Sequence, residues 1–113
     1  MVDTYLAKYE GKELELFRNY GNPYETISIR VQIDEGWMYL GDEEVEHGPD
    51  GGRSIEIFTF DKDNTRKAFR LLSWTGTDPI EQLKSTLDGT SRTHRFIDLC
   101  KELGIEFTRK LYF

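Results

Sequence analysis

The chain has 113 residues, a length typical of one domain, and an aromatic content of 13% that argues against intrinsic disorder. Its formal net charge of −6 repels phosphate backbones at long range, which disfavours non-specific nucleic-acid binding. The single cysteine, Cys100, excludes an intrachain disulfide, and no apolar run approaches the roughly 20 residues that cross a bilayer. The N-terminus lacks the basic and apolar regions of a signal peptide. We therefore expect one domain, residues 1–113, located in the cytoplasm.

The N-terminal half has the patterns of β-strands. Residues 5–9 and 12–20 flank Glu10-Gly11, which predicts a hairpin turn with glycine at positive φ. Gly21-Asn22-Pro23 then interrupts the strand pattern, because these residues favour turns. Residues 26–33 alternate apolar and polar side chains, which predicts a half-buried antiparallel strand.

The same pattern continues to residue 60. Asp34-Glu35-Gly36 predicts a turn, and residues 37–40 predict a short strand. The polar stretch 41–52 has the Gly, Pro and acidic content of a mobile hairpin loop. Residues 54–60 predict the strand that follows this loop.

Residues 65–74 are ambiguous between strand and helix. The preceding segment 61–64 resembles a tight hairpin loop, and no clear apolar stripe at helical spacing emerges, so we expect a strand. A short helix capped by Asn64 is the alternative.

The C-terminal third changes to a helical period. Asp78-Pro79-Ile80-Glu81 resembles a capping box and begins a helix that Gly89 ends. A second helix is expected over 93–103, and the alternation over 105–113 predicts a closing strand. The sequence therefore predicts an α+β fold: a mainly antiparallel β-meander of about six strands, then two α-helices and a C-terminal strand.

No motif for catalysis, metal binding or cofactor binding is complete. Neither His47 nor His94 lies near a nucleophile elbow, and Cys100 falls on a buried helical stripe, where thiols are usually inert. Glu44 and His47 have a metal-ligand spacing but lie in the predicted loop, and no second copy of the motif accompanies them. We assign no catalytic residue, no metal and no cofactor. A small enzyme stays an alternative only if a substrate or partner completes its site.

Charge is distributed unevenly along the chain. Residues 1–63 hold 15 Asp and Glu against 6 Lys and Arg, a balance of −9, whereas residues 64–113 hold 6 against 9, a balance of +3. The plain interpretation is that this charge keeps the domain soluble. The sharper one is a non-enzymatic protein-binding or regulatory module, of the inhibitor, immunity or anti-defence type, that engages a basic protein through its acidic β-half. The predicted partner surface combines acidic and aromatic side chains: Asp34, Glu35, Trp37, Tyr39, Asp42, Glu43, Glu44 and Glu46.

A single-stranded nucleic-acid binder is the alternative function. Basic and aromatic side chains concentrate on two adjoining predicted strands, where they could hold phosphates and stack bases: Phe58, Arg66, Lys67, Phe69 and Arg70. The terminal strand, residues 106–113, could instead pair with another chain's sheet if it lies at a sheet edge.

Overall fold

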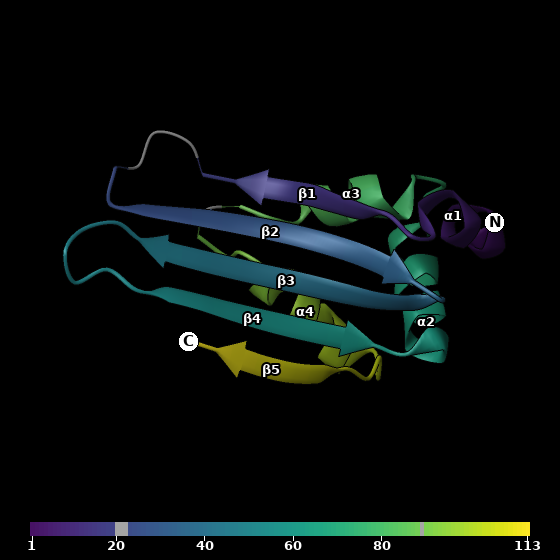
Figure 1. Cartoon of the computed structure of the whole chain (residues 1–113). Helices are drawn as coiled ribbons and strands as arrows, with labels where there is room; N and C mark the ends of the chain where they lie inside the picture. Colours follow the sequence, from purple (N-terminus) through teal and green to yellow (C-terminus); the bar gives the residue numbers. More distant parts are fainter. Residues whose placement is uncertain (20–22, 89) are drawn as a thin grey trace.

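The computed structural model describes residues 1–19, 23–88 and 90–113, which form one antiparallel sheet with helices on one of its faces (Figure 1). The strands lie side by side in chain order, and each pairs antiparallel with the next. The α+β class with an antiparallel meander is confirmed, with five strands rather than about six. The elements are α1 Val2–Tyr9, β1 Glu13–Arg18, β2 Glu25–Asp34, β3 Trp37–Glu46, β4 Arg53–Phe60, α2 Lys62–Leu72, α3 Pro79–Ser85, α4 His94–Glu102 and β5 Thr108–Tyr112.

The first predicted strand, residues 5–9, is wrong, because this segment belongs to helix α1. Its apolar side chains recur at the i, i+3, i+4, i+7 spacing of a helix rather than at the alternate positions of a strand. Three of them pack against the core and the last is buried: Val2, Tyr5, Leu6 and Tyr9. Glu10-Gly11 therefore joins a helix to a strand and is not a hairpin turn.

The prediction of a strand over 65–74 is also wrong, because residues 62–72 form helix α2. Its inner stripe is Thr65, Ala68, Phe69 and Leu72, and two of these residues are too small or too polar to register as an apolar pattern. Asp61, not Asn64, caps the helix: its carboxylate accepts from the Asn64 backbone N–H at 2.9 Å.

The third correction concerns residues 41–52, of which the first six continue strand β3 instead of forming a loop. Asp and Glu have low strand propensity, but β3 is paired on both sides, by β2 and by β4. The hydrogen bonds of two neighbours outweigh that propensity. Only the connection between Glu46 and Arg53 remains a loop.

The remaining predictions fit the structure. The turn at Glu35-Gly36 is confirmed as a two-residue hairpin loop with φ of 51° and 81°, the positive values that a type I′ turn requires. The carboxylate of Glu10 accepts from the backbone N–H groups of both residues, at 2.7 and 3.0 Å. The two C-terminal helices and the closing strand are present as α3, α4 and β5. The predicted break at Gly21-Asn22 and the helix stop at Gly89 lie outside the described residues.

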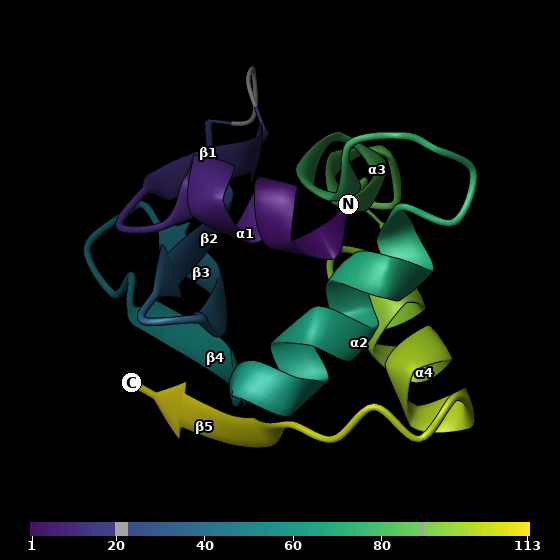
Figure 2. The same cartoon turned by 90° about the vertical axis from the view of Figure 1, so that its right-hand side faces the viewer.

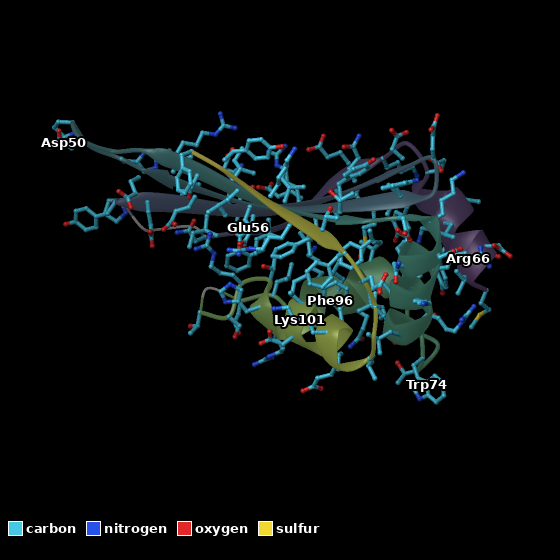
Figure 3. The ribbon with its side chains drawn as sticks, turned by 90° about the horizontal axis from the view of Figure 1, so that it is seen from below. Asp50, Glu56, Arg66, Trp74, Phe96 and Lys101 are labelled. Carbon is cyan, nitrogen blue, oxygen red and sulfur yellow. The ribbon has the colours of Figure 1, made fainter. Side chains whose placement is uncertain are left out.

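Figure 2 shows the sheet and the helix layer end-on, and the buried core residues come from both layers. The Phe60 ring packs between Phe96 of α4 and Phe107, with ring centroids 6.1 and 5.4 Å away. Each fully buried side chain of this size stabilises the fold by about 1.5–3 kcal/mol. Helices α2, α3 and α4 lie on this side and α1 lies at one end of the sheet, so none of the described helices covers the opposite face (Figure 3).

Candidate functional site

The candidate site is the face of the sheet that points away from the helices, which we call the open face. Its side chains follow from strand register, because successive side chains along a strand alternate between the two faces. In β2 the buried apolar residues are at odd positions, and in β3 the buried residues are at even positions; the intervening positions, which include the buried Ser28, belong to the open face. The open-face residues of the three central strands are Thr26, Ser28, Arg30, Gln32, Asp34, Trp37, Tyr39, Gly41, Glu43, Val45, Arg53, Ile55, Ile57 and Thr59.

At the middle of the open face lies a hollow centred on Gly41. Gly41 pairs with Arg30 of β2 on one side and with Ile57 of β4 on the other. A methyl group placed on Gly41 would meet no atom within 4 Å. Gly41 is one of the residues that line an open-topped hollow of about 400 Å³, which we call the Gly41 pit. Glycine is not required here by the backbone, since Gly41 is absent from the residues at positive φ.

The β4 wall of the Gly41 pit is apolar, whereas most of the other lining residues are polar or charged: Glu13, Ser28, Arg30, Gln32, Glu43 and Arg53. Ile55 and Ile57 of β4 are only half-buried on this face, and Tyr39 of β3 stands beside them. Ile55 is also paired with Tyr112 of β5, which is 47% exposed. An antiparallel sheet usually presents polar side chains to solvent, so the half-buried isoleucines of β4 are a feature typical of a docking surface.

The rim of the open face carries charges of both signs, and these charges pair with one another. The Nε of Arg53 donates to the Glu43 carboxylate at 2.8 Å, and Arg30 lies 3.7 Å from the carboxylate of Glu13. These pairs are partly exposed, so each contributes at most about 1 kcal/mol to stability. Paired charges around a partly apolar hollow are a feature that protein interfaces share.

The structure divides the eight residues predicted as one acidic partner surface. Four of them belong to the open face. Tyr39 and Glu43 line the Gly41 pit, and Asp34 and Trp37 pair with each other at the ends of β2 and β3. Glu35 lies in the hairpin turn. The other three point to the helix side: Asp42, Glu44 and Glu46. The prediction that these acidic residues share a mobile loop is wrong, because residues 42–46 belong to strand β3.

Asp42 forms a buried ion pair that joins the sheet to the helix layer. Its side chain is only 3% exposed, and the Nε of Arg92 donates to its carboxylate at 3.1 Å. Burial raises the pKa of Asp42 above its ordinary value, although the Arg92 guanidinium opposes this effect. Arg92 adopts a φ of 53°, a left-handed conformation that costs a side-chain-bearing residue roughly 1–2 kcal/mol. Asp42 is therefore a structural residue and is not available to a partner.

The predicted nucleic-acid face is not assembled. Phe58 and Phe69 are 2% and 0% exposed and belong to the core, so neither ring can stack on a base. Arg66, Lys67 and Arg70 are on helix α2 rather than on a strand. Arg66 pairs with Asp3 of α1.

The reactive side chains singled out in the sequence have structural roles. Burial raises the pKa of the Cys100 thiol to about 12, so it is protonated at neutral pH and is not a nucleophile. His47, which directly follows β3, has its Nε2 2.7 Å from the hydroxyl of Thr26 in β2. Among the residues that the structure describes, no three His, Cys, Asp or Glu side chains are grouped so that they could hold a metal ion. None of the described helices is long and apolar enough to span a membrane.

The Gly41 pit was not identified from the sequence, although the signal is present. Strand β4 carries apolar residues on both faces, with Phe58 and Phe60 inward and Ile55 and Ile57 outward. A strand of this kind needs cover on both sides. In the neighbouring strand β3, the residue paired with Ile57 is Gly41, so the apolar side chains of β4 lie beside a position without a side chain.

Comparison with known proteins adds no relative to this description. No family model, no curated protein and no solved structure matches the chain. The fold and the geometry of the open face therefore carry the functional proposal.

Proposed function

We propose that the chain is a non-enzymatic protein-binding module that docks its partner on the open face. The observation that carries this proposal is the Gly41 pit, a hollow in the middle of a sheet with an apolar wall on β4 and paired charges around it. A glycine within a strand destabilises it by roughly 0.5–1 kcal/mol relative to alanine. Since no contact within the described chain requires glycine here, the vacancy is available to a side chain of another protein.

The partner that fits is a basic protein that inserts an apolar side chain into the Gly41 pit. An apolar side chain the size of leucine or phenylalanine would gain about 1.5–3 kcal/mol from burial there. The balance of −9 over residues 1–63, which include β1 to β4, favours approach of a positively charged surface. Steering depends on this summed field, so it operates even though the rim charges are paired locally.

The geometry favours protein over nucleic acid as the partner of the open face. Open-face cations such as Arg30 and Arg53 are already paired with carboxylates, so a phosphate backbone would meet a balanced rim. The net charge of −6 opposes a polyanion as well.

Quantitative affinity capture from nuclease-treated lysate of the source cells tests the proposal. The bait is the parent chain or Gly41→Val, which places a branched side chain in the Gly41 pit. Gly52→Val is the matched control: Gly52 also has open space around its Cβ, but it lies in the β3–β4 loop. We expect a stoichiometric protein that the parent and Gly52→Val retain and Gly41→Val loses. Equal retention by all three baits would exclude the Gly41 pit as the docking site.

β5 lies at the edge of the sheet, so the condition for strand pairing with another chain is met. Its outward positions include Lys110, and a charged lysine on an edge strand is a device that discourages such pairing. The open face is therefore the better-supported surface.

A further inference from the structure

A second surface lies on the helix layer, away from the open face. Trp74, which follows α2, is 84% exposed, and Leu103 after α4 is 56% exposed. Figure 3 shows Trp74 at the far side of the helix layer, pointing away from the sheet. An exposed tryptophan beside other apolar side chains is a stronger indication of binding than a single exposed leucine.

The two residues line a shallow groove of about 260 Å³ between the ends of α2 and α4. Lys67, Leu71 and Trp74 follow one another at i, i+4 and i+7, so they lie along one face of α2 and its final turn. Leu103 and Ile105 line the opposite side. Arg70 completes the set, four residues before Trp74.

The charge of this groove is opposite to that of the chain as a whole. Among the described residues, no carboxylate forms an ion pair with Lys67 or Arg70, whereas their neighbour Arg66 is paired with Asp3. Two cations at the border of an apolar groove complement carboxylates that flank an apolar side chain. This groove therefore selects for a partner of the opposite charge from the partner of the open face.

We propose that the groove between Trp74 and Leu103 binds an acidic, apolar segment of another protein. Trp74 and Leu103 enclose the apolar side chain of that segment, and Lys67 and Arg70 pair with its carboxylates. Single-stranded nucleic acid fits less well, because such binders stack successive bases on several aromatic rings along a basic track. Here Trp74 is the one aromatic among the groove residues, and the other apolar residues of the lining are aliphatic.

Tryptophan fluorescence gives a direct test in a Trp37→Phe background, where Trp74 is the one remaining tryptophan. The probe is a synthetic peptide of repeating Glu-Leu pairs. A Lys-Leu peptide and oligothymidylate are the comparison ligands. We expect the Glu-Leu peptide to shift Trp74 emission to shorter wavelength in a saturable manner. We expect no such shift with the Lys-Leu peptide.

Two variants separate the groove from unspecific association. Arg70→Glu should weaken Glu-Leu binding by about tenfold or more at low salt, since it replaces attraction with repulsion. Trp74→Ala, followed by calorimetry, should lose binding while circular dichroism stays unchanged, because the side chain is exposed. Gly41→Val should bind the peptide as the parent does, which keeps this test independent of the open face. Equal binding of both peptides, binding unaffected by Arg70→Glu, or binding of oligothymidylate alone would overturn the proposal.

Discussion

A valine at Gly41 should stabilise the protein while it weakens binding, a combination that few surface substitutions produce. A Cβ at Gly41 has no neighbour within 4 Å, and its backbone is not at positive φ. Gly41→Val therefore replaces a flexible residue with one that favours strands, and we expect a gain of about 1 kcal/mol in the free energy of unfolding. The same side chain removes the space for a partner's apolar group worth about 1.5–3 kcal/mol, which corresponds to a loss of affinity of about tenfold or more.

Urea denaturation followed by circular dichroism measures the first effect. The midpoint should rise with an unchanged m-value, and the melting temperature should rise by about 4 °C. Gly51→Val is the matched contrast, because a Cβ there would lie 2.1 Å from the carbonyl oxygen of Glu46. We expect this variant to lose about 1 kcal/mol or more. If Gly41→Val is destabilised as much as Gly51→Val, the pit is not open and the reasoning fails.

Three further predictions concern the interactions that support the site. Arg92→Ala should lower the free energy of unfolding by about 3–5 kcal/mol, because it leaves Asp42 charged and buried. Because burial raises the pKa of Asp42, the folded state of this variant binds a proton more readily than the unfolded state. The free energy of unfolding of Arg92→Ala should therefore rise as pH falls. A loss of stability that does not depend on pH would refute this account. Burial acts to raise the pKa of Asp78, but donors from Lys8, Tyr9, Ile80 and Glu81 outweigh it and hold the pKa below its ordinary value. Asp78→Ala should therefore cost about 2 kcal/mol at neutral pH, and the difference from the parent should vanish as pH falls through the folded-state pKa; a difference that persists in acid would contradict the cap. With its pKa raised to about 12, Cys100 should resist a thiol reagent at pH 8 until denaturant is added, and rapid labelling of the native protein would be the contrary result.

Local sequence patterns were sufficient for part of the fold. The alternation in residues 26–33 defines which side of β2 faces the core, and the Asp-Pro start of α3 combines an N-cap with proline in the first turn. In both cases the determining residues are neighbours in sequence. The α+β class followed from these segments.

The errors arose where distant residues decide the structure. The acidic residues of β3 predicted a loop from their local sequence alone. In the structure Asp42 is paired with Arg92, 50 positions later in the chain. The sequence of helix α2 predicted a strand because two of the residues on its buried face, Thr65 and Ala68, are small or polar. Whether such residues are buried depends on what packs against them. Tertiary context overrides local propensity in both segments.

The candidate site was only partly predictable for the same reason. Tyr39 and Glu43 were identified from residue type alone, and both line the Gly41 pit. The pit itself depends on the pairing of Gly41 with Ile57, which is a property of strand register. Exposure of Trp74 likewise follows from the way α2 and α4 end, not from the sequence around it.

Site-specific photo-crosslinking in the source cells tests the central claim most directly. A benzophenone-bearing phenylalanine analogue replaces Tyr39 at the Gly41 pit, and in a second variant it replaces Lys84, which is exposed on α3. The open-face account predicts a discrete, nuclease-resistant protein adduct from position 39 that Gly41→Val suppresses and that position 84 does not form. Adducts from position 84 alone, or a position 39 adduct unaffected by Gly41→Val, would contradict it.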